Sequence, residues 1–235
     1  MFWKYQVGKF RESYQVLTYD ARAQGNSDLS DLPLTLTQHA KDLVDLLTFL
    51  KIKKAHFIGI SLGARISLAF TKLQPQKVNS LILCSIAMET SAHAHQIFQA
   101  AKNILEQNGK ESMAEYLLPY LSGSYFSKKE QTFKRAMAKA IANRNKKESL
   151  FVQLEAMQTY PDFSELTLPL QIPSLLITGS EDRLFTDSEA ERLVNHLGGQ
   201  WEQIHDTGHS IPIEIPDLFH KIVRKFIESC PICSR

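Results

Sequence analysis

The sequence predicts an α/β fold with a mainly parallel sheet that is interrupted by an all-helical insertion. Short apolar, β-branched runs recur at intervals that leave room for crossover helices. Helical spacing of apolar residues fills several of those intervals, and residues 89–166 contain no convincing strand. With 235 residues, 43% of them hydrophobic, the chain can bury one sizeable core. We therefore expect residues 1–88 and 167–235 to form the core and residues 89–166 to form a cap.

The expected strands are short runs, apolar enough to be buried on both faces, as in a parallel sheet covered by helices. They are Tyr14–Tyr19, Ala55–Ile60, Val78–Ser85, Pro173–Thr178 and, with a weaker pattern, Gln200–His205.

Two of the expected core helices have clear start signals. Thr35 and Gln38 fit a capping box, in which the Gln38 side chain reaches back to the N-cap. The residues Leu43 to Leu50 then place four leucines on one helical face. A final amphipathic helix is expected over Pro216–Ser229, with proline at its first position.

The insertion shows four helical patterns and no strand. The expected helices are Ile97–Leu105, Ser112–Leu121, Lys128–Ala142 and Glu148–Met157. A helical insertion between two strands is expected to cover the carboxyl edge of the sheet, where open α/β sheets bind ligands. Its larger apolar residues fit either a substrate pocket or the packing of the cap itself: Met113, Leu117, Leu118, Tyr120, Tyr125, Phe126, Met137 and Met157.

A G-x-S-x-G motif lies between an expected strand and an expected helix. It is Gly59-Ile60-Ser61-Leu62-Gly63, preceded by Ala55–Ile58 and followed by a helical pattern. This setting is typical of a nucleophile elbow, a sharp turn that holds the serine hydroxyl out at the end of the sheet. We expect the two flanking glycines to let the strand and the helix approach closely.

A serine hydroxyl needs an adjacent base that is oriented by a carboxylate. Asp182 follows the fourth expected strand, and His209 lies in the loop after the fifth, so both are expected at the same edge as Ser61. Glu181 and Asp187 are the rival carboxylates. The sequence therefore predicts a catalytic triad of Ser61, Asp182 and His209.

With these motifs the chain resembles the α/β-hydrolase superfamily, in the branch with a helical cap. The resemblance covers nearly the whole chain outside the cap. It rests on Asp20–Ser27, which is similar to a D-x-R-G-x-G-x-S loop, on the elbow, on Gly179–Asp182, and on Gly208-His209 followed by Glu214 and Pro216. Ala23 and Ala64 stand where glycines are common in that family.

The resemblance implies a serine hydrolase that needs no cofactor and no metal. Ser61 would attack a carbonyl, His209 would take its proton, and Asp182 would hold the imidazole. The backbone N–H of Leu62 would donate to the oxyanion. The implied substrates are small carboxylic esters, thioesters or lactones.

Two rival functions stay open at this point. The same sequence pattern and the same triad are also found in carbon–carbon bond hydrolases, which this chain resembles as well. A weakly active or inactive hydrolase-like binding protein is the alternative from another class. Haloalkane dehalogenases and epoxide hydrolases need an aspartate at the elbow, so Ser61 argues against both.

The N-terminal part departs from the family pattern. The second oxyanion donor is expected from a loop after an earlier strand, and residues 2–10 resemble the helix that follows that loop. We therefore expect an N-terminally shortened sheet with an exposed edge. The expectation is that Met1 is an internal or mis-assigned start, or that the protein is a natural truncation with weak activity.

Composition narrows the partners and the compartment. A net charge of +2 gives no argument for nucleic acid or membrane binding. Three cysteines and no secretory signal favour a reducing, cytoplasmic location. Cys230 and Cys233 form a C-x-x-C that we interpret as two tail thiols.

One stretch of the cap is strongly basic. Residues 127–148 contain eight Lys or Arg and two Glu, a local charge of +6. It fits a solvated helix face, and it also fits attraction of an anionic small-molecule acyl substrate or an acidic carrier such as an acyl carrier protein.

Overall fold

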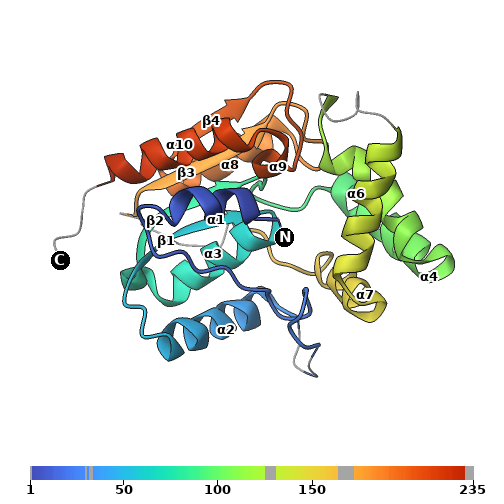
Figure 1. The fold of residues 1–235 in the computed structure, drawn as a ribbon, viewed down its shortest axis with the longest axis horizontal. Helices are drawn as coiled ribbons and strands as arrows, with labels where there is room; N and C mark the ends of the chain where they lie inside the picture. The colour runs from blue at the N-terminus through green and yellow to red at the C-terminus, as the bar shows by residue number, and fades with distance from the viewer. Residues whose placement is uncertain (1, 30, 32–33, 125–130, 164–171, 231–235) are drawn as a thin grey trace.

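A computed structural model describes residues 2–29, 31, 34–124, 131–163 and 172–230 (Figure 1). Within these ranges the chain alternates helices and strands, as predicted. The elements are α1 (Lys4–Phe10), α2 (Leu36–Phe49), β1 (Ala55–Ile60), α3 (Leu62–Leu73), a 3₁₀ turn η1 (Pro75–Lys77), β2 (Val78–Cys84), α4 (Ala92–Leu121), α6 (Gln131–Arg144), α7 (Lys147–Ala156), β3 (Ser174–Gly179), α8 (Asp187–Leu197), β4 (Gln200–Ile204), α9 (Ile211–Glu214) and α10 (Pro216–Ser229).

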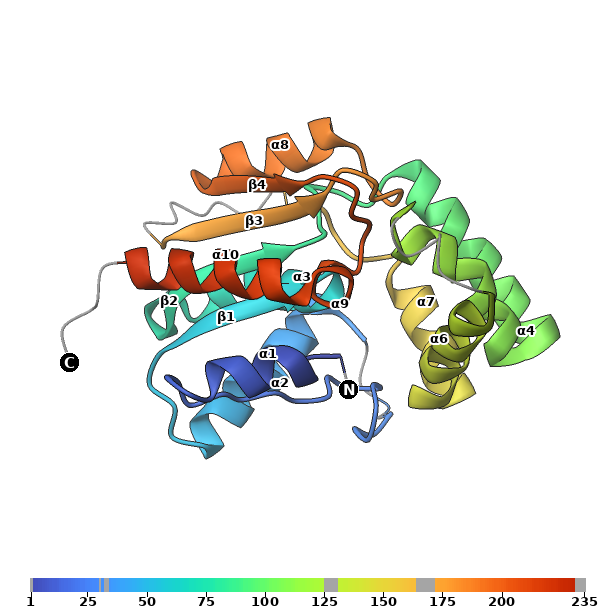
Figure 2. The same ribbon diagram turned by 45° about the horizontal axis from the view of Figure 1, so that its top comes forward.

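The four strands form one parallel sheet in the order β1-β2-β3-β4. All four carboxyl ends therefore meet at one edge, and Figure 2 shows the arrowheads pointing toward α4, α6 and α7. The strands predicted from residue 55 onward are confirmed to within about a residue at each end.

Side chains alternate between the two faces of the sheet and reach two separate cores. In β2, Leu81 and Leu83 pack with α2, α3 and α8, whereas Ile82 and Cys84 pack with α1 and α10. This period of two is what a strand buried on both faces requires. These helices thus form a layer on each face of the sheet and do not cover the edge at which the strands end.

The strand predicted over Tyr14–Tyr19 is wrong. Residues 15–20 form no ladder in the structure, and Val16, Leu17 and Tyr19 are 39%, 42% and 40% exposed. A strand is made by hydrogen bonds to a neighbour, and no described strand pairs with this segment. Its apolar pattern was compatible with a strand, but pattern alone does not supply the partner.

The helical insertion is confirmed over its described residues. Two predicted helices are joined in α4, which kinks at Gly109, where φ is +85° and ψ is −177°. The helices α4, α6 and α7 pack on one another through their own apolar cluster, which includes Ala101, Leu105 and Leu154. In Figure 1 they lie together beside the sheet. Residues 128–130, Tyr125, Phe126 and Cys233 lie outside the described residues.

The capping box predicted at the N-terminus of α2 is present only in part. Thr35 accepts a hydrogen bond from the Gln38 N–H at 3.1 Å, but the Gln38 side chain donates to Asp42 instead of reaching back. A complete capping box stands at α8, between Thr186 and Glu189. None of the helices in the described ranges combines the length and apolar character that a membrane crossing requires.

Candidate active site

Ser61 lies at the turn between β1 and α3. Its backbone has φ +50° and ψ −116°, a conformation that non-glycine residues rarely adopt. Its N–H donates to the Cys84 carbonyl at 2.9 Å, which ties the turn to the end of β2. The strand-to-helix turn predicted from the motif is therefore present, with the strain centred on the serine.

Only one of the two flanking glycines has the steric role that the sequence predicts. A Cβ at Gly59 would lie 2.4 Å from the Gly63 carbonyl carbon, so Gly59 permits the close approach of strand and helix. A Cβ at Gly63 would meet nothing within 4 Å. The expectation of a steric need is wrong for Gly63.

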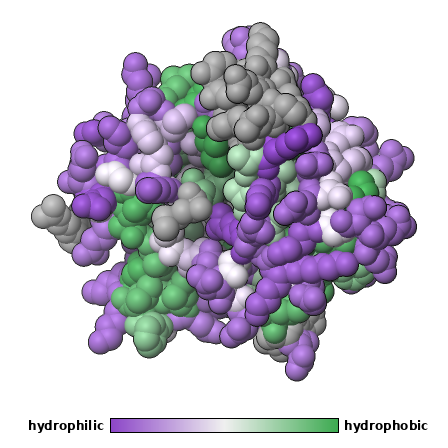
Figure 3. All heavy atoms as spheres, turned by 45° about the vertical axis from the view of Figure 1, so that its right-hand side comes forward, coloured by the Kyte–Doolittle hydropathy of each residue, from purple (hydrophilic) through white to green (hydrophobic). Residues whose placement is uncertain are grey.

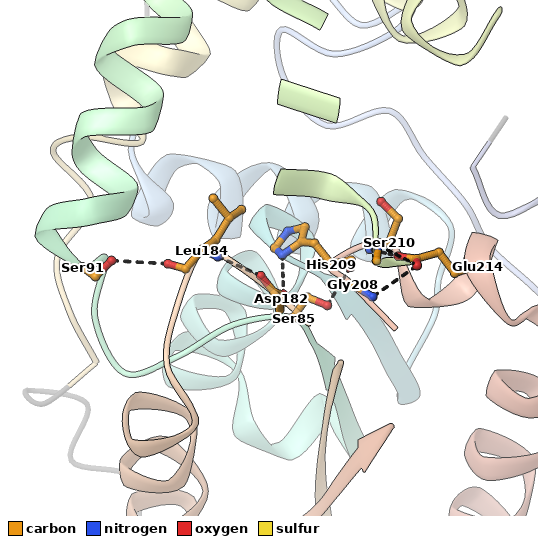
Figure 4. Close-up of polar contacts among 9 residues, drawn as sticks. Ser85, Ser91, Asp182, Leu184, Gly208, His209, Ser210 and Glu214 are labelled. Atoms are coloured by element: carbon orange, nitrogen blue, oxygen red, sulfur yellow. Dashed lines mark hydrogen bonds and ion pairs between the residues drawn. The ribbon is translucent and has the colours of Figure 1, made fainter. Parts of the chain in front are cut away.

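His209 and Asp182 form a buried pair beside this turn (Figure 4). The distance from His209 Nδ1 to Asp182 Oδ2 is 2.7 Å, and the side chains are 6% and 1% exposed. The other carboxylate oxygen of Asp182 accepts the Leu184 N–H at 3.0 Å. Both oxygens are thus held, and the imidazole is oriented through Nδ1.

The rival carboxylates lie elsewhere. Glu181 accepts a hydrogen bond from the Ser124 N–H, and Asp187 accepts one from the Gln203 side chain. Of the three carboxylates considered from the sequence, Asp182 is the one hydrogen-bonded to His209.

A buried carboxylate, Glu214, holds the loop that carries His209. Its Oε2 accepts the N–H groups of Gly123 at 2.9 Å and Gly208 at 3.2 Å, and its Oε1 accepts that of Ser210 at 3.2 Å. Burial raises the pKa of Glu214, while these three donors act in the opposite direction. Glu214 belongs to the sequence pattern that resembles the family, but that pattern does not predict this role.

The same loop lies directly against the end of the long cap helix. The Ser210 N–H donates to the Leu121 carbonyl at 3.1 Å. A Cβ at Gly208 would come within 2.3 Å of the Gly123 nitrogen, so the two backbones touch. The end of α4 and the His209 loop therefore cannot move independently without breaking these contacts.

Two pockets meet at Ser61 and His209, and both residues line both pockets. The first, here called the polar pocket, also contains Arg65, Glu89, Thr90 and Tyr160 in its lining. The second, the apolar pocket, is lined mainly by cap residues such as Met113, Leu117, Ile141, Leu150 and Leu154. Figure 3 shows the face of the molecule that carries the cap, on which hydrophilic residues cover most of the surface and hydrophobic residues are exposed in several places between them.

Three of the cap residues expected from the sequence, Met113, Leu117 and Met157, line the apolar pocket. Leu118 and Tyr120 are not in its lining. Arg65 was missed as a site residue because a charged residue in a helix is usually on the surface. Its position four residues after Ser61, about one helical turn further along the chain, was the available signal.

Leu62 is the first residue of α3 and lines the polar pocket. Its N–H has no acceptor within the helix, because the first N–H groups of a helix lack one. Within the described ranges, no group of three or more His, Cys, Asp and Glu residues is arranged to hold a metal ion.

Comparisons with known proteins agree with this architecture. A family model described as alpha/beta hydrolase fold matches residues 1–216. The chain is 26% identical over 227 residues to 3-oxoadipate enol-lactonase 1 of Acinetobacter baylyi, an alignment covering 97% of this chain and 84% of that protein.

Two solved structures have a similar fold. The enol-lactonase from Burkholderia xenovorans LB400 matches with a TM-score of 0.86 and 24% identity, over 97% of this chain and 86% of that one. A thermophilic esterase from Thermogutta terrifontis matches with a TM-score of 0.85 and 23% identity, over 97% and 84%.

Proposed function

The chain belongs to the alpha/beta hydrolase fold family and is a hydrolase, and we propose that it cleaves a small carboxylic ester, thioester or lactone through an acyl-enzyme on Ser61. The observation that carries the proposal is the buried His209–Asp182 pair, 2.7 Å apart, whose His209 lines the same pocket as Ser61. The similarity to proteins named as enol-lactonase and esterase supports an ester or lactone as the bond cleaved.

The proposed reaction follows from the orientation of the imidazole. With Nδ1–H donated to Asp182, Nε2 carries the lone pair that accepts the Ser61 proton. Ser61 Oγ forms a bond to the carbonyl carbon, and the alcohol or thiol leaves with the proton from His209. Water, deprotonated by His209, then cleaves the acyl-enzyme to the acid and restores Ser61.

We assign the first oxyanion donor to the backbone N–H of Leu62. The N-terminus of α3 adds a favourable field, because the partial positive charge of a helix lies at that end. Loss of one oxyanion donor typically lowers the rate by about 10²–10³. Leu62 is thus proposed to stabilise the charge that develops in the transition state.

We further assign residues 1–88 and 167–235 to the hydrolase core and residues 89–166 to a substrate-selecting cap. The separate apolar cluster of α4, α6 and α7 and the cap residues in the apolar pocket support this division. In this assignment the core performs the chemistry and the cap shapes one side of the pocket.

The proposal is tested with a fluorophosphonate probe, which modifies activated serines. Wild-type protein is expected to be labelled and Ser61→Ala is not. Ser67→Ala is the matched control, because Ser67 lies on the helix that follows Ser61, lines neither pocket and donates to the Gly63 carbonyl. Equal labelling of wild type and Ser61→Ala, or no labelling of wild type, would overturn the proposal.

A product assay separates the bond types. For an ester substrate, one equivalent each of acid and alcohol is expected, and the rate of Ser61→Ala should fall to the background level. Release of a carbon–carbon cleavage product from a diketone, with no ester hydrolysis, would contradict the assignment of the bond.

A further inference from the structure

Arg65 is a charged residue in a helix whose inward face is otherwise small or apolar. Its neighbours on α3, Ala64, Ile66 and Leu68, are 0–2% exposed. The Arg65 N–H donates to the Ser61 carbonyl at 3.1 Å, so the two residues lie one helical turn apart. Both line the polar pocket.

The guanidinium of Arg65 is held in place on two sides. Nη2 donates to Thr90 Oγ1 at 3.1 Å, and the guanidinium carbon lies 5.1 Å from the centroid of the Phe163 ring. The other terminal nitrogen, Nη1, is buried and has no hydrogen-bond partner. A guanidinium nitrogen that is removed from water without a partner is unfavourable, which makes it a ready donor for a ligand.

The charge of Arg65 is also uncompensated in the part of the chain that the structure describes. No carboxylate there forms an ion pair with Arg65, and Glu89, the acidic residue in the same lining, pairs with Arg192. Burial lowers the pKa of Arg65 to about 10 and raises that of Tyr160, also in the lining, to about 12. At neutral pH the guanidinium is therefore cationic and the phenol is neutral.

We propose that Arg65 is a specificity-determining residue that binds a carboxylate on the substrate, so that the enzyme prefers esters or lactones carrying a free acid group. This inference rests on the serine hydrolase function proposed above. The carboxylate takes the position beside Nη1, while the reacting carbonyl lies at Ser61. An anion there supplies both the missing acceptor and the missing negative charge.

The spacing along α3 limits the length of the preferred substrate. The backbones of Ser61 and Arg65 are one helical turn apart, a rise of about 6 Å along the helix axis. A carboxylate and an ester carbonyl separated by a few methylene groups span such a distance. The preferred substrates are therefore half-esters of short dicarboxylic acids, or lactones with a short acidic side chain.

The experiment compares two series of ethyl esters that differ only in charge. One series is the monoethyl esters of succinic, glutaric and adipic acids, and the other is the ethyl esters of the matching monoamides. For wild type, kcat/KM should be at least 10-fold higher for the acid than for the amide at one or more chain lengths. Arg65→Met should lower kcat/KM for that acid ester by about 10- to 100-fold and change the amide ester less than threefold.

Controls separate direct binding from other effects of charge. Arg224→Met removes the same charge from the exposed surface of α10 and should change neither series more than twofold. The effect of Arg65→Met should persist in 0.5 M NaCl, because salt screens exposed charges far more than buried contacts. An effect that disappears in salt would overturn the proposal, because it would show that Arg65 acts through its long-range charge and not by direct contact.

A measurement on wild type keeps the test decisive if Arg65→Met does not fold. Glutarate should inhibit hydrolysis of ethyl butyrate competitively at a concentration at least 10-fold lower than glutaramide does. Equal inhibition, or equal kcat/KM for the acid and amide esters, would overturn the role of Arg65 while leaving the hydrolase intact. No Ser61-dependent hydrolysis of any ester would instead overturn the proposed function.

Discussion

The polar and apolar pockets share Ser61, His209, Phe98, Met157 and Leu184, but the rest of their linings comes from different parts of the chain. Several polar residues of the first pocket, among them Arg65 and Ser85, come from α3 and from the ends of the strands. The lining of the second comes largely from α4, α6 and α7. The catalytic residues lie at the junction, so a change in the shared residues should affect every substrate, whereas a change in one wall should affect only substrates that reach it.

The largest effect is expected from a change at Asp182, which orients the His209 side chain that both pockets share. Asp182→Asn keeps the shape of the side chain but removes the charge that orients His209, so kcat should fall by about 10⁴. The fall should be the same for an acidic ester and for a neutral long-chain ester, measured by initial rates on each. A loss confined to one of the two substrates would contradict a triad shared by both pockets.

A smaller shared effect is expected at Glu214, which acts through the His209 loop. Glu214→Gln replaces one acceptor oxygen with an amide that cannot accept an N–H, so one of its three backbone donors loses its partner. Leaving a buried donor unpaired costs about 1–3 kcal/mol. We expect a fall in kcat of about 10-fold with little change in KM, since Glu214 touches no substrate.

The matched control is Glu228→Gln, which alters an exposed ion pair with Arg224 on α10. Exposed pairs contribute little, so its kcat and melting temperature should stay close to those of wild type. If Glu214→Gln raised KM and left kcat unchanged, the residue would be shaping a pocket wall rather than positioning His209.

The sequence predicted the features that depend on local pattern. The strands from residue 55 onward, the turn at Ser61 and the final helix are each encoded by neighbouring residues, and each is present. The order of Ser61, Asp182 and His209 along the chain was enough to expect them at one sheet edge, because parallel strands end together.

The features that the sequence did not predict depend on contacts between distant segments. The segment Tyr14–Tyr19 has the pattern of a strand, but a ladder needs a neighbour that the pattern does not specify. Glu214 accepts a hydrogen bond from Gly123, and the two residues are 91 positions apart in the chain. Arg65 looked like a surface residue, and the ring of Phe163 beneath its guanidinium comes from beyond the cap helices.

The smallest effect is expected from a larger side chain in the lining of the apolar pocket. Ile141 is half-buried on α6 and lines the apolar pocket, so Ile141→Phe should occupy space used by the far end of a long acyl chain. A methylene group that loses its apolar contact costs about 0.8 kcal/mol, or about fourfold in kcat/KM. The ratio of kcat/KM for an octanoate ester to that for a butyrate ester should therefore fall by about fourfold or more.

The control for this change is Ile104→Phe, because Ile104 packs against the same cap cluster but lines neither pocket. It should leave the ratio of octanoate to butyrate ester unchanged. The acidic esters proposed to bind at Arg65 should also be unaffected by Ile141→Phe, since they extend into the other pocket. An equal fall for acidic and long-chain esters would mean that both use one common space, and the two walls would then not select substrates independently.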